Sequence, residues 1–353
     1  MDSFTFTVQT GPVAVFFHET ITIPVLPRSG GIYVADENTL PLLQKAKNFD
    51  SSMPLVVLAP GEEEKQLSSV ERILEAALNA GLARDSVFVG FGGGVVTDMT
   101  AFAASLYMRG AGLCLVPTTL LAMADAAVGG KTGVDFGNFK NCVGTFYPAQ
   151  EIHISVDALR TLPQAEFMSG LAEVVKTAML YAPKLYQILW EKKESILSRD
   201  GDLLLEIVKR CVQAKAHVVE RDLKETGERM FLNLGHTFAH ALETVAGLGT
   251  ISHGEAVAWG IARALELGKR AGITDLDWAK EATGLIASYG YSIAPVHPVL
   301  AGRNEAETPQ LLLNAMKNDK KKKGGVVRFV LQREINSTLV TPVPDAEVLA
   351  VLA

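Results

Sequence analysis

The segment Asp85–Gly110, DSVFVGFGGGVVTDMTAFAASLYMRG, consists of an apolar run, three consecutive glycines and a second apolar run with helical spacing. This order predicts a buried strand, a tight turn and a helix. Residues 54–78, PLVVLAPGEEEKQLSSVERILEAAL, repeat it as a strand, a Pro-Gly turn and an amphipathic helix. Further strand-like runs occur at 4–8, 14–17, 30–36 and 112–117. Strands that alternate with helices indicate a largely parallel sheet with crossover helices, whose ligands bind beyond the carboxyl ends of the strands.

The pattern of predicted elements changes near residues 150–160. Before this point strands alternate with helices, and after it helical patterns continue to about residue 290. We therefore expect two domains: an α/β domain at residues 1–155 and a mainly helical domain at 156–353. The densest charged run is KNDKKKK, residues 317–323. Its part at 319–323 precedes a predicted strand and is expected to be an exposed loop.

Composition limits the function. The net charge of −6 and the pI near 5.7 give no general attraction to nucleic acid or to an anionic membrane. No apolar run reaches membrane-spanning length, and the start MDSFTFTVQT has no signal-peptide pattern. The three cysteines, Cys114, Cys142 and Cys211, form no CxxC motif, which is typical of a protein in a reducing cytoplasm.

The triple glycine Gly92-Gly93-Gly94 lets backbone amides approach a phosphate at the start of a helix. It is not a full GxGxxG motif, because Thr97 stands at the last glycine position. A tight turn without a ligand explains it equally well.

A second glycine-rich segment, residues 124–148, contains GGKT, but Asp125 stands where a P-loop has its first glycine. A carboxylate there would face phosphates, so nucleoside triphosphate binding is excluded. The segment presents Lys131, Lys140 and Asn141, which suit a small anionic ligand; solvated loop lysines are the alternative.

Three histidines, His236, His240 and His253, occur close together. The first two are four residues apart on one helix face, and glycines before His253 let the chain turn back toward them. This spacing is typical of a metal site, although surface or capping histidines would also explain it. Glu173 and Lys176 share a helix face and would by default form a surface salt bridge, and Lys215 would by default be a solvated lysine.

Together these segments resemble the 3-dehydroquinate synthase family of the sugar-phosphate cyclases. The matching text is GGGVV.DM, YMRG, PTTLLA..D..VGGKTGV, KN..GTFY, LP..EF..GLAEVVK, GERMFLNLGHT..HA.E, SHGEAVA and DKK...G..RFVL, over residues 61–331. The resemblance implies a Rossmann-like NAD-binding α/β domain, a mainly α-helical metal-binding domain, and an active site in the cleft between them.

The resemblance also implies roles for individual residues. Zn²⁺ or Co²⁺ would be held by Glu173, His236 and His253, which replaces His240 in the set suggested by spacing. The catalytic residues would be Lys176, Lys215, Glu225, His240 and Asp125. Substrate would be bound by Arg109 (from a neighbouring subunit), Lys131, Asn141, Arg229, Asn233, Lys320 and Lys321. NAD would be bound by Asp36, Glu62, Lys65, Gly93, Gly94, Asp98, Thr118, Thr119, Lys140, Leu159 and Thr161.

The implied reaction converts 3-deoxy-D-arabino-heptulosonate 7-phosphate to 3-dehydroquinate and phosphate, in the shikimate pathway of aromatic amino acid biosynthesis. It is a carbon–oxygen lyase reaction with transient oxidation by NAD, phosphate elimination, reduction and aldol closure. A substrate with a phosphate and a carboxylate requires many Lys and Arg groups. The implied protein is a cytoplasmic homodimer with a small-molecule substrate and with neither nucleic acid nor a membrane as partner.

The sequence departs from the family pattern at Thr97, at Thr100-Ala101, at Ala239 and at Ser169. The departures at Thr97, Thr100-Ala101 and Ala239 bear on NAD affinity and loop shape, and the Thr97 hydroxyl is a candidate contact for the pyrophosphate. The alternatives are a related cyclase such as aminodehydroquinate synthase, a metal- and NAD-dependent polyol dehydrogenase, and a non-catalytic protein that keeps the fold.

Overall fold

The computed structural model describes residues 2–137, 139–247, 249–304, 306–321 and 326–353, without the side chains of 319–321. The chain forms two compact units. The first, here called the sheet unit, consists of Met1–Phe167 and Arg199–Lys224. The second, the helical unit, consists of Met168–Ser198 and Glu225–Ala353.

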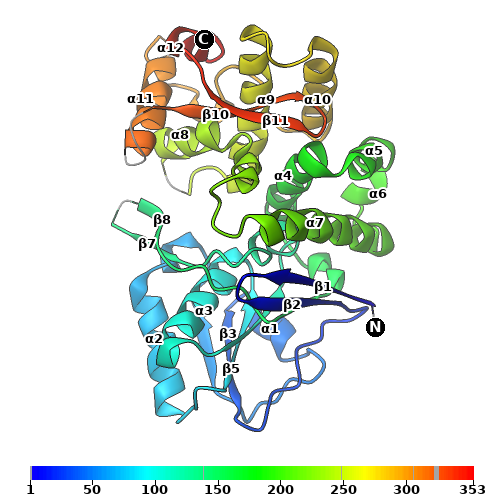
Figure 1. Ribbon diagram of the computed structural model, residues 1–353, viewed down its shortest axis with the longest axis vertical. Coiled ribbons are helices and arrows are strands. Elements are labelled where there is room, and N and C mark those ends of the chain that lie inside the picture. The colour runs from blue at the N-terminus through cyan, green and yellow to red at the C-terminus, as the bar shows by residue number, and fades with distance from the viewer. Residues whose placement is uncertain (1, 138, 248, 305, 322–325) are drawn as a thin grey trace. The chain divides into compact units, whose positions relative to one another are not determined.

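A seven-stranded sheet with the strand order β1-β2-β9-β6-β5-β3-β4 forms the centre of the sheet unit (Figure 1). All neighbouring strands are parallel except the β1–β2 pair at one edge, which is antiparallel. The strands are β1 (Asp2–Val8), β2 (Gly11–Phe17), β3 (Gly31–Asp36), β4 (Leu55–Leu58), β5 (Val87–Gly92), β6 (Gly112–Pro117) and β9 (Glu151–Ile154). The predicted parallel sheet is confirmed.

Apolar side chains pack on both faces of this sheet. Alternate residues of β5, such as Val89 and Phe91, join Tyr33 and Val116 in one buried cluster. The helices α2 (Leu67–Asn79) and α3 (Gly94–Leu106) lie side by side along the sheet, and α3 contacts β3, β5 and β6 (Figure 1). Alternation of strands and helices therefore fixes the turn at Gly92–Gly94 at the carboxyl end of a central strand.

Shorter elements complete the sheet unit. The glycine-rich segment contains an antiparallel ribbon of β7 (Val134–Phe136) and β8 (Phe139–Val143). The 21-residue helix α7 (Gly201–Arg221) starts at the N-cap Asp200, whose side chain accepts a hydrogen bond from the Leu203 amide. It packs on β1 and on η3. The other elements are α1 (Leu40–Leu43), η1 (Glu62–Glu64), η2 (Tyr107–Arg109), η3 (Ala122–Ala126) and η4 (Val156–Arg160).

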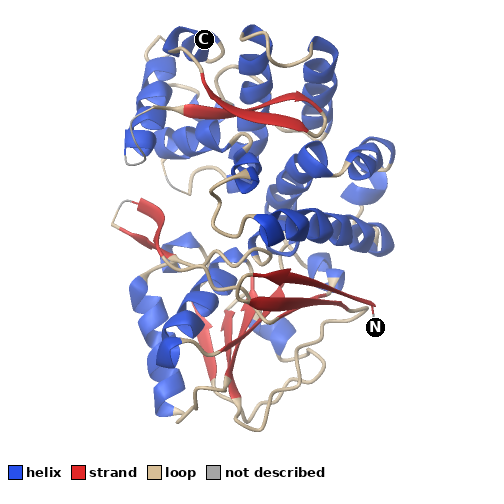
Figure 2. Cartoon of the chain, in the orientation of Figure 1, coloured by secondary structure: helices blue, strands red, loops and turns tan. Residues whose placement is uncertain are grey.

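In the helical unit, an antiparallel strand pair lies among the helices (Figure 2). Its α8 (His236–Ala246) and α9 (His253–Arg270) pack together, α11 (Thr308–Lys321) packs on α8, and the antiparallel pair of β10 (Arg328–Glu334) and β11 (Ser337–Pro342) packs with β10 on α9. The remaining elements are α4 (Gln164–Tyr181), α5 (Pro183–Glu191), α6 (Lys193–Leu197), η5 (Glu228–Asn233), α10 (Leu276–Ser288), η6 (Pro298–Leu300) and α12 (Asp345–Ala350). The α/β plus mainly helical fold class is confirmed.

Two details differ from the sequence analysis. The compact units do not follow one cut in the sequence, because α7 packs on the sheet although it follows α6 of the helical unit. The domain boundary between residues 155 and 156 stays a prediction. Of residues 319–323, expected as an exposed loop, 319–321 continue helix α11 instead, and 322–323 lie outside the described residues.

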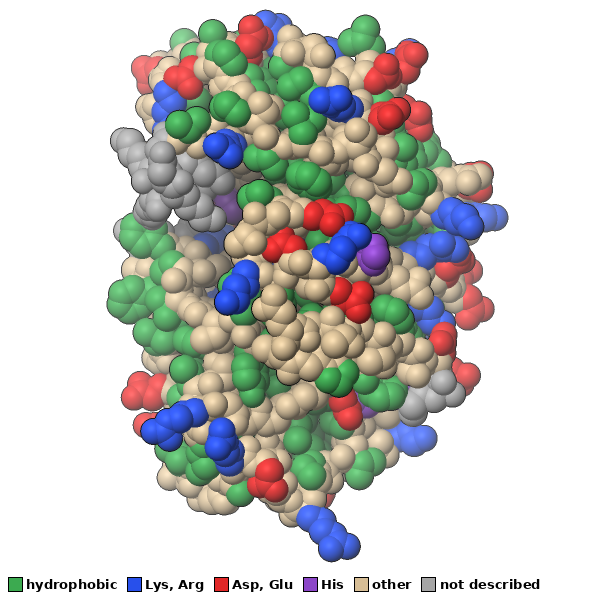
Figure 3. All heavy atoms as spheres, in the orientation of Figure 1, with side chains coloured by type: hydrophobic (Ala, Val, Ile, Leu, Met, Phe, Trp, Pro, Cys, Tyr) green, Lys and Arg blue, Asp and Glu red, His purple; other side chains and the backbone are tan. Residues whose placement is uncertain are grey.

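Neither the surface charge nor the hydropathy of the helices indicates a binding surface. On the face drawn in Figure 3, acidic and basic side chains of the described residues are interspersed instead of gathering by sign. Within the part of the chain that the structure describes, none of the helices has both the length and the apolar character needed to cross a membrane.

Candidate active site

Three side chains of the helical unit form a compact set of metal-ligand atoms. The ligand atoms of Glu173, His236 and His253 all lie within 4.8 Å of one another. The Glu173 Oε1 atom is 3.5 Å from His253 Nε2 and 3.9 Å from His236 Nε2. These distances exceed those of hydrogen bonds. Ligands about 2.0–2.2 Å from a tetrahedral zinc ion are about 3.3–3.6 Å apart, so the 3.5 Å separation matches donors that share one ion, and the 3.9 Å separation is slightly wider. The three residues fit a divalent metal.

Local packing brings these ligands together. Glu173 comes from the middle of α4, and His253 is the first residue of α9. Next to His253, the Gly254 amide donates a hydrogen bond of 3.1 Å to Ser169 Oγ. A Cβ atom at Gly254 would lie 2.0 Å from the Ser169 backbone oxygen, so only glycine allows this approach. Because Ser169 lies one helical turn before Glu173, this contact fixes the position of His253 relative to Glu173.

The charges around Glu173 keep it ionised. Burial favours the protonated carboxyl, but the adjacent Lys176 ammonium, which forms an ion pair with Glu173 Oε2, lowers the Glu173 pKa with help from His253 and His236. The resulting pKa is well below the ordinary value. Burial, and then Lys176, also lower the pKa of His236 well below its usual range, so this ring is neutral at pH 7. A carboxylate and a neutral imidazole are the forms that bind metals.

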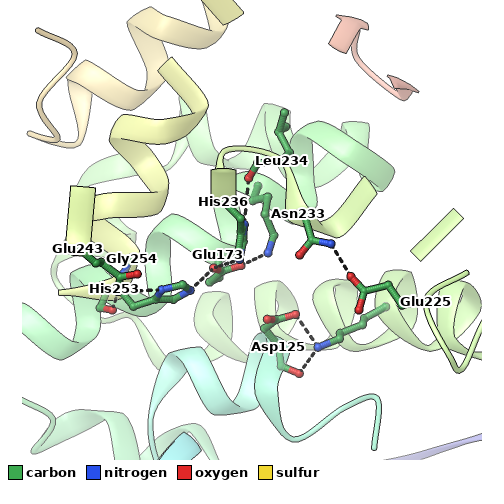
Figure 4. Close-up of polar contacts among 12 residues, drawn as sticks. Asp125, Glu173, Glu225, Asn233, Leu234, His236, Glu243, His253 and Gly254 are labelled. Atoms are coloured by element: carbon green, nitrogen blue, oxygen red, sulfur yellow. Dashed lines mark hydrogen bonds and ion pairs between the residues drawn. The ribbon is translucent and has the colours of Figure 1, made fainter. Parts of the chain in front are cut away.

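His253 has a carboxylate on each side of its ring (Figure 4). Its Nε2 faces Glu173, and its Nδ1 lies 3.5 Å from Oε1 of Glu243, which is 5% exposed. Burial lowers the His253 pKa, but the two carboxylates raise it to about 9. A carboxylate behind a ligating imidazole fixes its orientation and raises its basicity. Glu243 has no role in the predicted site, although its position two helical turns after His236 places both residues on the same helix face.

Other predicted site residues also belong to the helical unit. Lys176 is buried beside Glu173, and Arg229, in η5, is 2% exposed. The Asn233 side-chain amide donates a hydrogen bond to the Glu225 carboxylate. His240 is exposed, with its ring centroid 5.6 Å from that of His236. Lys320 and Lys321 end α11, and their side chains lie outside the described residues.

In the sheet unit, the buried Lys215 forms an ion pair with the half-buried Asp125. The Lys215 ammonium lies 2.6 Å from both the backbone oxygen and the Oδ1 atom of Asp125. Lys215 is 6% exposed, so this α7 residue is not the solvated lysine that was its default interpretation.

A second buried lysine of the sheet unit, Lys65, joins two other predicted residues. Its ammonium group is 2.7 Å from Asp98 Oδ2 and 2.6 Å from Asn141 Oδ1. Burial disfavours the charged lysine, but Asp98 raises the Lys65 pKa above its ordinary value. The structure thus connects α3 with the β8 strand of the glycine-rich segment through one cation.

The glycine turn has the features of a phosphate-binding turn. Gly93 is the N-cap of the 13-residue helix α3, and a Cβ atom there would approach Thr119 Cγ2 to 3.0 Å. The Thr118 hydroxyl is buried and has no hydrogen-bond partner among the described residues. The turn and this hydroxyl fit the pyrophosphate of a dinucleotide. The Thr97 hydroxyl instead bonds to the Gly93 and Gly94 carbonyls, so it satisfies itself within α3.

The remaining predicted residues have varied surroundings. Asp36 ends β3, and its Oδ1 accepts bonds from the amide and hydroxyl of Thr39. Leu159 is buried, and its carbonyl accepts a bond from Arg199. Lys140 is half-buried in β8. The exposed members of the set are Glu62, Arg109, Lys131 and Thr161. Their roles, like those of the other predicted site residues, stay predictions.

Comparisons with solved structures show which class of protein has this fold. The structure is similar to a 2-epi-5-epi-valiolone synthase of Streptomyces hygroscopicus subsp. jinggangensis solved with NAD⁺ and Zn²⁺, with a TM-score of 0.82 and 26% identity over 96% of this chain and 95% of that chain. It also shares its fold with a 2-deoxy-scyllo-inosose synthase complexed with carbaglucose-6-phosphate, NAD⁺ and Co²⁺, with a TM-score of 0.83, 22% identity and 99% coverage of both chains. The fold is that of the sugar-phosphate cyclases.

Sequence comparisons identify the family within this class of protein. Residues 55–169 match the family model for the 3-dehydroquinate synthase N-terminal region, and residues 170–322 match the model for its C-terminal region. The 3-dehydroquinate synthase of Acidithiobacillus ferrooxidans is 38% identical over 348 residues, 97% of this chain and 93% of the relative. The chain belongs to the 3-dehydroquinate synthase family, so the expected family is confirmed.

Proposed function

We propose that this chain is an enzyme that converts 3-deoxy-D-arabino-heptulosonate 7-phosphate to 3-dehydroquinate and phosphate. The observation that carries the proposal is the convergence of Glu173, His236 and His253, a set of metal donors, in a chain that matches the synthase family over almost its whole length. A scaffold protein would have no use for a buried carboxylate held in its ionised form.

The proposed cofactors are NAD and a divalent metal, Zn²⁺ or Co²⁺. NAD⁺ with Zn²⁺ or Co²⁺ is bound in the two related cyclase structures. In this chain Glu173, His236 and His253 would hold the metal, while Gly93, Gly94 and Thr118 would meet the NAD pyrophosphate. When bound, the metal would polarise a substrate hydroxyl, and NAD would accept and return a hydride.

The charged residues would bind the anionic substrate and move its protons. Arg229, Lys131 and Lys176 provide cations for the phosphate and carboxylate, and Asn233 provides an amide. Lys215 would hold Asp125 in place, with Glu225 and His240 as candidate proton carriers. The buried ion pairs fix these groups before substrate binds, so little reorganisation accompanies the reaction.

The proposal places the enzyme among the carbon–oxygen lyases and in the cytoplasm, where the shikimate pathway supplies the precursors of the aromatic amino acids. We further propose a homodimer in which Arg109 contacts the partner's substrate. Met108 and Arg109 both have positive φ angles, 46° and 66°, and both side chains are exposed. A strained, outward-facing turn of this kind is typical of a residue positioned for a ligand.

Product analysis tests the proposal. Purified protein is incubated with the seven-carbon keto-acid phosphate, NAD⁺ and Zn²⁺ or Co²⁺, and phosphate and 3-dehydroquinate are quantified. We expect equal amounts of both products, and none from the protein treated with a chelator. Exchange of Lys131, an exposed residue, for Ala should raise KM about 10-fold or more because a charged hydrogen bond is lost. An equally exposed lysine of α5, Lys184, provides the control for loss of charge.

Two outcomes would redirect the proposal. Faster turnover of the amino analogue than of the keto-acid phosphate would identify an aminodehydroquinate synthase. Stoichiometric NADH from a simple polyol, without phosphate from the keto-acid, would identify a dehydrogenase.

A further inference from the structure

A second set of atoms able to bind a metal lies in the sheet unit and consists of residues that have no role assigned above. The donor atoms of Cys114, Glu151 and His153 lie within 4.8 Å of one another. Cys114 is on β6, and the other two residues are on β9. We call these residues the thiol–imidazole cluster.

The strand register explains why the three side chains meet. Cys114 pairs directly with Glu151 across the β6–β9 ladder. Residues two apart on a strand point to the same face, so Glu151 and His153 both project beside Cys114. Cys114 also belongs to the buried cluster that contains Val89 and Phe91. The cluster therefore lies at the border of this core, with Cys114 2% exposed and the Glu151 side chain 44% exposed.

A fourth residue, His18, orients the imidazole of the cluster. His153 Nε2 lies 3.0 Å from Glu151 Oε2, and His153 Nδ1 lies 2.9 Å from Nε2 of His18. The two rings are nearly parallel, with an interplanar angle of 6°. A neutral His18 ring can accept a hydrogen bond at Nε2 from the Nδ1–H group of His153. A ligating imidazole whose second nitrogen donates to a fixed acceptor is the usual arrangement in metal sites.

We propose that Cys114, Glu151 and His153 form a second divalent-metal site, of the zinc class, with His18 as its positioning residue. Sulfur, nitrogen and carboxylate oxygen are the donors that Zn²⁺ and Co²⁺ accept, and three protein ligands leave a position for water. On binding, the Cys114 thiol loses its proton to solvent and its sulfur bonds to the metal. His153 bonds through Nε2 and carries its proton on Nδ1, from which it donates to His18. Glu151 exchanges its contact with the imidazole for a bond to the metal.

Cobalt absorption distinguishes this site from the first one. A thiolate bound to Co²⁺ gives a sulfur-to-metal charge-transfer band in the near ultraviolet, whereas Glu173, His236 and His253 contain no sulfur. We expect the full chain, titrated with Co²⁺ alone, to bind two equivalents and to show this band for one of them. Cys114→Ser should abolish the band and leave one equivalent bound. Cys142→Ser, which changes an exposed cysteine outside the cluster, should leave the band intact.

Two further variants keep the test decisive if Cys114→Ser fails to fold. Glu151→Gln changes a half-exposed side chain and should weaken cobalt binding in the charge-transfer titration at least 10-fold. His18→Leu removes the acceptor behind His153 and should weaken it about 10–100-fold. The proposal is overturned by the absence of a charge-transfer band in the wild-type chain, by a band that is lost in Cys142→Ser, or by wild-type cobalt affinity in both Glu151→Gln and His18→Leu.

Discussion

Exchange of Gly254 for Ala should loosen the proposed metal site without altering any ligand. The added Cβ would lie 2.0 Å from the Ser169 backbone oxygen, whereas ordinary van der Waals contact begins near 3.4 Å. The obstacle is backbone, which cannot rotate away, so the first turn of α9 has to move from α4 by more than an ångström. That turn carries His253, and α4 carries Glu173.

The expected costs follow from this displacement. Overpacking of a close helix contact should lower the free energy of unfolding by about 1–3 kcal/mol. Displacement of His253 should weaken metal binding about 10–100-fold, as the loss of a residue that orients a ligand does. The first quantity is measured by urea denaturation of the chelator-treated protein, and the second by competition for Zn²⁺ with a chromophoric chelator.

A matched glycine provides the control. Gly284, in α10, would place its Cβ 3.6 Å from Trp190 Cη2, which is ordinary contact. Gly284→Ala should leave metal affinity unchanged and stabilise the protein by about 0.4–1 kcal/mol. Wild-type metal affinity and stability in Gly254→Ala would refute the inference that the Ser169 contact fixes the position of His253 relative to Glu173.

Three further predictions concern single side chains. Glu243→Gln should weaken Zn²⁺ binding about 10–100-fold in chelator competition, because His253 loses its second carboxylate; unchanged affinity would show that Glu243 does not orient the ring. Lys215→Met should lower stability by about 1–3 kcal/mol in urea denaturation, because the half-buried Asp125 carboxylate loses its contact with the Lys215 ammonium. Arg210→Met on the same helix removes a surface pair with Glu206 and should cost about 0.5 kcal/mol or less. Burial lowers the pKa of His297 below 6.5, with Glu255 opposing. A histidine whose pKa is lower in the folded than in the unfolded state contributes its full stability above the unfolded-state pKa and loses that stability as the pH falls. The free energy of unfolding of the wild-type protein should therefore decrease between pH 7 and 5 by more than that of His297→Asn. This variant keeps an acceptor for the Val299 amide. Equal pH slopes for the two proteins would contradict this assignment.

Much of the fold could be predicted from local sequence, because its signals are local. The strand, glycine turn and helix of residues 87–106 appear as expected, as do the strands at 4–8, 14–17 and 112–117. The position of α7 could not be predicted this way. Its amphipathic pattern shows that one face is buried, but not that the partner is β1, about two hundred residues earlier in the chain.

Only part of the candidate site could be predicted from local sequence. The spacing of His236, His240 and His253 predicted that they lie close together. The glycines before His253 explain why the chain turns back toward α8 there. Spacing could not show that Glu173 lies beside His236 and His253, because Glu173 is on another helix, α4. The packing partners Ser169 and Glu243 were also missed, since a close approach of α4 to α9 has no local signal. The Thr97 hydroxyl bonds within its own helix, as threonine often does.

The central claim is that this chain recycles NAD while it eliminates phosphate from the keto-acid. The most direct measurement supplies holoenzyme with Zn²⁺, excess seven-carbon keto-acid phosphate and NAD⁺ at a small fraction of the substrate concentration, and records absorbance of NADH together with phosphate and 3-dehydroquinate. We predict that nearly all substrate is converted, with both products formed equally and no accumulation of NADH. Turnover that stops after one equivalent of NAD⁺, with NADH accumulating in the same amount, would contradict the claim.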